Sequence, residues 1–478
     1  RLQEKRNEAR KISVLFLLLI LFERRYNMAT DSSIMDANSF KSSDADSLDA
    51  RTRNLVERRE KVLGASYRLF YRKPVHLTQG KGVYLWDADG TKYLDMYNNI
   101  PSMGHSNKAV VEAVYEQMQK INTHTRYLHE NIVAYSEQLL SLMPPEINKV
   151  MFMCSGSEAN DLALRMCMNY MGGTGILLSK EAYHGNTFLV SAVSPALGGE
   201  QELWNGARLV PTPDFYRSGM SEEEFTNWYC AQIQEAIDDL KARGIKLACF
   251  IADSIFSSDG VHPNPKGFLK AAVDVVHKNG GLFIADEVQP GFCRTGDSFW
   301  GFARHEIIPD LVTMGKPMAN GIPCSALAGK SEILASFSEK FPYFNTFAGN
   351  PVSMAASLAV LKFIKDEDIL SHTKKVGAEL LSALKEVQSR HSGIVGDVRG
   401  SGLFIGFELV GDAQKKTPDK ERTLRLIDLM YERKVLTSNC GTYGNVLKIR
   451  PPLVFQSKDI DWFCCALDES LSVLEMGR

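Results

Sequence analysis

The sequence predicts an α/β fold with a large, mostly parallel β-sheet and a smaller C-terminal α+β domain. The chain has 478 residues, of which 44% are hydrophobic and 23% charged, a globular composition with enough length for more than one packed domain. From residue 108 onward, short apolar runs alternate with helical patterns, which indicates parallel strands connected by helices. After residue 350, two helical stretches precede glycine-punctuated strand candidates, which indicates a second domain.

These changes of pattern divide the chain into four expected segments. They are a disordered or non-native extension (1–50), an N-terminal segment (51–107), a large domain (108–349) and a small C-terminal domain (350–478). The extension contains an apolar run at 12–22 that is too short to span a bilayer and has no cleavage site after it. Because Met28 offers a plausible start, we expect this run not to be native. The Ser/Asp-rich stretch from there to residue 50 predicts a mobile tail.

Composition limits the classes of partner and compartment. Lys plus Arg (55) nearly equals Asp plus Glu (57), so we expect no nucleic-acid partner, and we expect no membrane partner. The nine cysteines have no CxxC spacing, which favours neither a disulfide framework nor a zinc site, and we expect no metal. This usage is typical of a reducing compartment. We expect a cytoplasmic location, with a mitochondrial one as the alternative, although acidic residues in the tail argue against a transit peptide.

The expected elements indicate where function should be sought. In the N-terminal segment, a charged helical stretch begins near Arg51, and strand-like runs cover 82–85 and 93–96. In the large domain, strands are expected at 150–153, 176–178, 247–251, 282–285 and 311–314. In the small domain, we expect helices at 351–365 and about 371–389, and strands within 398–409 and at 446–449. Ligands bind beyond the carboxyl ends of strands in such sheets, so the residues after each run are candidates.

The first candidate follows the run at 150–153. Ser155, Gly156 and Ser157 stand where this strand passes into a helix. Free amide groups at a helix N-terminus, two hydroxyls and a glycine that permits close approach form a natural phosphate cradle. Serine and glycine also cap helices for structural reasons, and this alternative stays open for the motif alone.

A carboxylate and an amine follow two later strands. Asp286 ends the run at 282–285, and a charge there requires a partner. A protonated pyridine nitrogen is one such partner, because an ionised carboxylate keeps the ring an electron sink, while a structural ion pair or a cap is the other interpretation. Lys316 lies in a Gly/Pro/Asn-rich loop after 311–314. A desolvated lysine amine can form an imine with an aldehyde and act as a base, whereas most loop lysines are merely solvated.

Five motifs in order resemble those of a known family. They read SGSEANDLALRMC, EAYHGNT, LFIADEVQPGFCRTG, LVTMGKPMANG and FNTFAGNPVSMAAS. They resemble the successive motifs of the class III aminotransferases, which depend on pyridoxal phosphate (PLP), and the resemblance covers about residue 61 to the C-terminus. It implies a fold type I PLP-transferase in which the large domain binds PLP.

The resemblance also implies roles for the matching residues. Lys316 would hold PLP as a Schiff base, Asp286 would pair with the pyridine nitrogen, and residues 155–157 would contact the phosphate. Tyr183 would stack on the ring and, with its neighbour His184 in the Tyr-His-Gly motif, would belong to the cofactor site. A plain core tyrosine is the structural alternative for Tyr183.

Four further positions concern the cofactor edge, the partner subunit and the substrate. Gln289 would lie near the phenolic oxygen of PLP, with a plain polar loop residue as the alternative. Thr346 resembles the threonine that reaches the phosphate of the neighbouring subunit, which implies a homodimer with its active site at the interface. Arg450 matches the arginine that clamps a substrate carboxylate, with a structural arginine as the alternative. Asp253 stands where many members carry a glutamate that pairs with that arginine, and a shorter side chain implies different substrate recognition.

The implied function is amino transfer from an amino acid or amine to an oxo acid, with Lys316 as the general base. Both substrates are small molecules. The alternative is elimination of phosphate and ammonia from phosphorylated amines such as phosphoethanolamine. Residues 98–99, 122–132 and 445–449 especially resemble the alanine-glyoxylate aminotransferase 2-like and phospho-lyase branch that does this. A third alternative is a PLP-binding dimer that has no catalytic activity. The presence of Lys316 and Asp286 argues against it.

Overall fold

A computed structural model describes residues 36, 38–198 and 202–477 of the chain. The apolar run at 12–22 and Met28 lie outside these residues. The large sheet has the order β4-β10-β9-β8-β7-β5-β6. Its strands are β4 (Lys149–Met153), β5 (Gly175–Ser179), β6 (Ala207–Val210), β7 (Leu247–Ala252), β8 (Leu282–Asp286), β9 (Leu311–Met314) and β10 (Ser325–Gly329). Neighbouring strands are parallel except at β10, which is antiparallel to both β4 and β9, so the mostly parallel sheet is confirmed.

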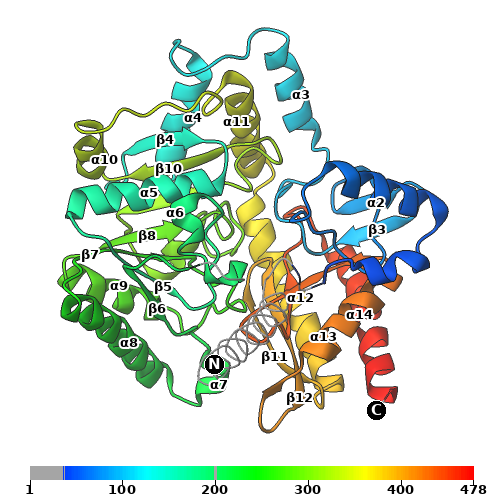
Figure 1. Ribbon diagram of the computed structural model, residues 1–478. Helices are drawn as coiled ribbons and strands as arrows, with labels where there is room; N and C mark the ends of the chain where they lie inside the picture. The colour runs from blue at the N-terminus through cyan, green and yellow to red at the C-terminus, as the bar shows by residue number, and fades with distance from the viewer. Residues whose placement is uncertain (1–35, 37, 199–201, 478) are drawn as a thin grey trace, which may run out of the picture.

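Helices cover both faces of this sheet (Figure 1). Helices α5 (Gly156–Met171) and α10 (Ser331–Ser338) pack on one face, in a cluster that includes Cys249 and Ile251 of β7. Helices α8 (Glu222–Ala242) and α9 (Phe268–Lys278) pack on the other face, in a cluster that includes Phe250. Successive side chains of a strand point to opposite faces, so a strand buried on both sides must be apolar throughout. This explains the continuous runs in the sequence.

The N-terminal segment and the small domain share a sheet. Strands β1 (Leu77–Lys81), β2 (Tyr84–Asp87) and β3 (Lys92–Asp95) form an antiparallel meander, and β14 (Val435–Leu436) pairs parallel with β3. A further sheet contains β11 (Val395–Ser401), β12 (Phe404–Asp412), β13 (Thr417–Pro418), β15 (Ser438–Cys440) and β16 (Val446–Ile449). Strands from the N-terminal segment and from the small domain therefore form one sheet. The linear division of the sequence did not predict this pairing.

The remaining helices connect these sheets. The small domain contains α11 (Pro351–Asp366), α12 (Ile369–Arg390), α13 (Lys420–Glu432) and α14 (Ser457–Met476). Elsewhere the chain forms α2 (Ala50–Val62), α3 (Lys108–Met118), α4 (Glu130–Leu140), α6 (Phe188–Ser191) and α7 (Phe215–Ser218), with short 3-10 helices at Ser42–Ser47, Pro195–Leu197 and Gly301–His305. No helix in the described ranges has the length and apolar content that crossing a bilayer requires.

Part of the expected mobile tail has a definite structure. The backbone N–H of Phe40 donates to the carbonyl of Leu69, and that of Tyr71 donates to the carbonyl of Asn38. Asp49 then caps α2 by accepting from the backbone of Arg51 and Thr52. Backbone pairing with a distant segment thus holds residues 38–50, a stretch whose own composition is too polar to form a core; the mobile tail stays a prediction.

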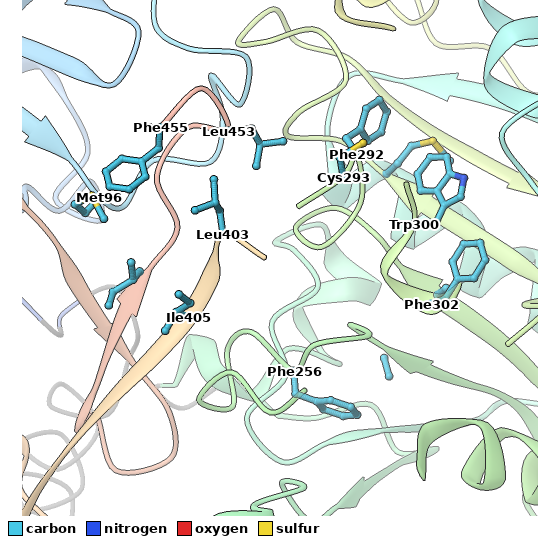
Figure 2. Packing of buried hydrophobic residues seen from close by; sticks show 14 of the residues in the cluster. Met96, Phe256, Phe292, Cys293, Trp300, Phe302, Leu403, Ile405, Leu453 and Phe455 are labelled. Atoms are coloured by element: carbon cyan, nitrogen blue, oxygen red, sulfur yellow. The ribbon is translucent and has the colours of Figure 1, made fainter. Parts of the chain in front are cut away.

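One hydrophobic cluster spans the large and small domains. Figure 2 shows Leu403, Leu453 and Phe455 on the side of the small domain, and Phe292 and Trp300 in the loop after β8. All five side chains are buried.

Within this cluster the guanidinium of Arg294 is also buried. Its Nη1 donates to the carbonyls of Leu403 and Pro451, and its Nη2 lies 3.4 Å from Ser102 Oγ. Burial, together with the nearby charge of Arg450, lowers the pKa of Arg294 to about 9. This arginine therefore ties the N-terminal segment, the large domain and the small domain together behind the site described next.

Candidate active site

A cavity of about 100 Å³ lies at the carboxyl ends of β4, β8 and β9. It is lined by Gly156, Ser157, Tyr183, His184, Gly185, Asp253, Asp286, Val288, Gln289 and Lys316. The amine, the carboxylate and the helix start that follow separate strands in the sequence therefore meet at one place.

Asp286 is held as a hydrogen-bond acceptor from three sides. Its Oδ2 lies 2.7 Å from His184 Nδ1 and accepts from Asn160 Nδ2 at 2.9 Å. Its Oδ1 accepts from the backbone N–H of Val288 at 3.1 Å. Donors to both oxygens fix the orientation of this carboxylate. Asn160 is itself oriented, because its Oδ1 accepts from Thr313 Oγ1 of β9 at 2.5 Å.

Lys316 follows β9 and is only partly exposed. The pKa of its amine is lowered to about 8, first by burial, which disfavours the charged form, and then by the positive charge of Arg450. The carboxylates of Asp286 and Asp253 act in the opposite direction. An amine with this pKa is partly neutral near pH 8, and a neutral amine is required of a nucleophile or a base.

The start of α5 forms the floor of the cavity. Gly156 is packed closely, since a Cβ there would lie 3.0 Å from both methyl groups of Val288. Gly185 of the Tyr-His-Gly motif lies still closer to α5, since a Cβ added there would be only 2.5 Å from Ser157 Oγ. Its φ of +142° is also one that residues with a side chain rarely adopt. Ser157 Oγ accepts from the backbone N–H of Asn186 at 3.1 Å. The Tyr183 loop is thus held directly against the helix N-terminus.

Three predicted site residues, Ser155, Thr346 and Arg450, are not among the residues that line this cavity. Ser155 is exposed and its hydroxyl caps α5, accepting from Glu158 N while Glu158 accepts from Ser155 N. This is the capping alternative that the sequence left open. Thr346 is exposed in the loop before α11.

Gln289 and Arg450 form one edge of the site. Gln289 Nε2 donates to Ser257 Oγ at 2.8 Å, and its Oε1 accepts from Arg450 Nη1. The Arg450 guanidinium lies 4.3 Å from the centre of the Tyr97 ring, and its Nε is buried without an acceptor in the described chain. Arg450 is therefore oriented by an aromatic face and an amide.

Asp253 does not neutralise that arginine. Its Oδ1 accepts from Ile255 N at 2.9 Å and its Oδ2 from Ser257 N at 3.0 Å, and among the described residues it forms no ion pair with Arg450. Burial raises the pKa of Asp253, and the Asp286 charge adds to the rise. The aspartate shapes its own loop, and its effect on substrate recognition stays a prediction.

Asn160 belongs to the site through its hydrogen bond to Asp286, and Lys448 lies near the site, although the sequence did not single them out. Asn160 lies within the SGSEANDL motif, and a buried amide on an otherwise apolar helix face was the available signal. Lys448 is a buried lysine in an apolar strand. Burial and then the positive charge of Arg450 lower the pKa of its amine to about 7.

Comparison with known proteins identifies the family of this chain. The model of the class III aminotransferases matches residues 70–471. The chain belongs to the class III aminotransferases. Among similar relatives of this family is the mitochondrial alanine-glyoxylate aminotransferase 2 homolog 2 of Arabidopsis thaliana, 40% identical over 87% of each chain. An ethanolamine-phosphate phospho-lyase homolog 1 of Caenorhabditis elegans is 34% identical, covering 88% of this chain and 93% of its own.

Solved structures of other enzymes share the fold. A phospholyase from Arthrobacter in complex with phosphoethanolamine superposes with a TM-score of 0.84 and 41% identity, covering 87% of this chain and 99% of that one. An aminotransferase from Bacillus anthracis gives a TM-score of 0.81 at 28% identity. This chain is therefore a fold type I PLP enzyme. The cavity fits that cofactor, because a lysine amine, a carboxylate held by three donors and a helix N-terminus surround a single space beside the Tyr183 side chain.

Proposed function

We propose that this class III enzyme eliminates phosphate from a small phosphorylated amine, with Lys316 as the general base. The observation that carries the shared chemistry is the meeting of Lys316, Asp286 and the start of α5 around one cavity. PLP held there supplies an electron sink for the carbon that carries the amine. Resemblance to the Arthrobacter phospholyase and to the phospho-lyase homolog supports elimination as the outcome.

Each residue has a separable task in this proposal. Lys316 holds the cofactor and then, as a neutral amine, takes the proton from the carbon that bears the substrate amine. Asp286 holds a proton on the pyridine nitrogen, and Tyr183 covers one face of the ring. Gly156 and Ser157 contact the cofactor phosphate at the N-terminus of α5, with Ser155 fixing that end as its cap. His184 orients Asp286, and Gln289 reaches the ring edge.

The reaction balances without a second substrate. Lys316 takes the proton from the amine-bearing carbon, the C–O bond at the next carbon breaks with its electron pair going to phosphate, a proton is returned to that next carbon, and water then releases ammonia to leave an aldehyde. Arg450 is suited to the departing dianion, because Asp253 leaves its charge unpaired.

Amino transfer is the second candidate, favoured by membership of the class III aminotransferases and by the Arabidopsis relative. It uses the same base and the same carboxylate. PLP held by Lys316 and Asp286 would supply the place where the amino group is kept, so an oxo acid would be required to complete the cycle.

We further propose that two chains form a homodimer in which Thr346 reaches the partner's cofactor phosphate. Its exposed position, away from the cavity of its own chain, supports this arrangement. We also propose a cytoplasmic location.

A paired assay tests the proposal. Purified enzyme loaded with PLP is given phosphoethanolamine alone, with detection of inorganic phosphate and aldehyde, and separately alanine with glyoxylate. We expect phosphate release without any oxo acid. Lys316→Ala should lower both activities by about 10²–10⁴-fold, because the base is gone. Phosphate release that depends on an oxo acid, or turnover retained by Lys316→Ala, would contradict the assignment.

A further inference from the structure

Ser257 is a fully buried serine that contacts two residues of the cavity lining. It lies in the loop after β7 and is 0% exposed. Its Oγ accepts from Gln289 Nε2 at 2.8 Å, and its backbone N–H donates to Asp253 Oδ2 at 3.0 Å. Gln289 and Asp253 line the cavity, whereas Ser257 does not. Ser257 therefore lies behind the wall of the cavity and connects two of the side chains that form it.

The hydrogen bonds around Ser257 have a fixed direction. A guanidinium can only donate, so Arg450 Nη1 requires the carbonyl oxygen of the Gln289 amide, and the amide nitrogen then faces Ser257. The Ser257 oxygen accepts this hydrogen bond and keeps its own proton for another acceptor. Burial raises the pKa of Asp253, and a hydrogen bond from the Ser257 side chain acts in the opposite direction. The contacts therefore run from Arg450 through Gln289 and Ser257 to Asp253.

This direction decides which group of Gln289 is left for the cavity. The side-chain amide of glutamine has two N–H donors and one carbonyl oxygen. Arg450 contacts the oxygen and Ser257 accepts from one N–H, so the second N–H is the donor that remains. Without the Ser257 hydroxyl, the amide nitrogen would lose the acceptor that holds it in place, and only the contact with Arg450 would restrain the amide.

We propose that Ser257 is a positioning residue, which fixes the amide of Gln289 so that an N–H donor faces the cavity. This rests on the proposed PLP site, in which Gln289 lies near the phenolic oxygen, and not on whether elimination or amino transfer follows. A donor at that edge stabilises an ionised phenolic oxygen, because a hydrogen bond to the charged form of a group favours that form. Ser257 acts through Gln289 and touches neither cofactor nor substrate.

The test is a spectroscopic titration of the PLP-loaded enzyme without substrate. The absorbance of bound PLP is recorded against pH, and the midpoint of its change is compared between wild type and Ser257→Ala. We expect the midpoint to rise by about 0.5–1 pH unit, because one hydrogen bond to the ionised form is weakened. The backbone N–H at 257 still donates to Asp253 in this variant, so only the hydroxyl contacts are lost. Should Ser257→Ala fail to fold, Ser257→Cys carries the same expectation, since a thiol is a weak acceptor.

Ser254→Ala is the matched control. Ser254 lies in the same loop and is 1% exposed, but its hydroxyl donates to Glu287 Oε1 at 2.8 Å, and neither of these two residues lines the cavity. Its replacement should leave the midpoint unchanged.

A double variant tests whether Ser257 acts through Gln289. In a Gln289→Ala background the Ser257 hydroxyl has no amide left to orient. Gln289→Ala with Ser257→Ala should therefore give the same midpoint as Gln289→Ala alone, because two residues that act through one contact have effects that do not add.

Failure of the inference and of the proposed function give different results. An unchanged midpoint in Ser257→Ala, an equal shift in Ser254→Ala, or additive shifts of Ser257→Ala and Gln289→Ala would each overturn the positioning role, whichever reaction the enzyme performs. The expected shift, together with no phosphate release by the wild type, overturns the elimination and leaves the positioning role standing. An unchanged midpoint, with phosphate released by the wild type, overturns the positioning role alone.

Discussion

Asp286 shows how much a single carboxylate depends on its neighbours. His184, Asn160 and the backbone of Val288 donate to it, and Thr313 orients Asn160 in turn. Such donors satisfy both oxygens of a buried carboxylate and hold it in one orientation. The reactivity expected of Lys316 therefore depends on residues that never touch substrate.

Asn160→Ala tests this dependence. We expect kcat to fall by about tenfold or more, because losing a hydrogen bond to a charged group costs roughly 1.5–3 kcal/mol. A readout specific to positioning is the pH dependence of the absorbance of bound PLP, which should shift as Asp286 holds the ring proton less firmly. Asn169→Ala is the control, since Asn169 lies on the same helix and donates to Ser336 far from the cavity. Equal titration of the two variants would contradict the positioning role.

At the scale of elements, the site forms where the ends of several strands, the start of a helix and their loops lie together. Helix α5 begins beside the ends of β8 and β9, and the Tyr-His-Gly loop lies against its first turn. The loop from Asp253 to Val261 runs from the cavity lining to the small domain, where Arg399 donates to its last carbonyls, and two of its residues, Phe256 (φ 50°) and Val261 (φ 61°), adopt left-handed backbone conformations. Such conformations are costly for bulky residues, so surrounding contacts must hold this loop in shape.

Gly185→Ala tests the contact between loop and helix. The new Cβ would lie 2.5 Å from Ser157 Oγ, so the Tyr183 loop must move away from α5. We expect the dissociation constant of PLP to rise at least about tenfold, measured by fluorescence titration of the apoenzyme. Gly219→Ala is the control: its φ is +67°, but nothing lies within 4 Å of the added Cβ. A change of PLP affinity in both variants alike would mean that backbone strain, and not the contact, is responsible.

At the scale of the whole molecule, buried ionisable groups join the two domains. His262, in the loop after β7, lies near Arg399 and Glu408 of the small domain, and its Nε2 is 3.2 Å from the carbonyl of Asp259. Arg399 in turn forms ion pairs with Glu408 and Asp397 and donates to the carbonyls of Gly260 and Val261. Burial and the positive charge of Arg399 lower the pKa of His262 to about 3.

The lowered pKa of His262 predicts that acid destabilises the folded chain. Between pH 6.5 and about pH 3 the unfolded chain binds a proton at His262 that the folded chain does not, so the free energy of unfolding falls as pH falls. One such group contributes at most about 1.4 kcal/mol per pH unit. His262→Gln should flatten the dependence in denaturant titrations from pH 7 to 4, while His305, also depressed, contributes equally to both proteins. Parallel curves would contradict the assignment.

The sequence predicted more of the fold than of the detailed contacts in the candidate site. The five expected strands of the large domain are all present, because a strand covered on both faces by helices must be apolar along its whole length. Strands β6 and β10 were missed: β6 contains a charged arginine, and β10 consists mainly of small residues that do not look like a strand. The pairing of β14 with β3 joins residues more than 300 positions apart, and no local pattern encodes it.

The sequence by itself determined the family, the sheet and the motifs that supply the amine, the carboxylate and the helix start, because each depends on a short contiguous pattern. Only the tertiary structure decided that Ser155 caps α5, that Asp253 turns to its own backbone, and that Arg450 Nε lies buried without an acceptor among the described residues. These outcomes depend on burial and on which donors and acceptors remain unpaired once distant segments pack together. That is a property of the folded chain, and no local pattern of residues determines it.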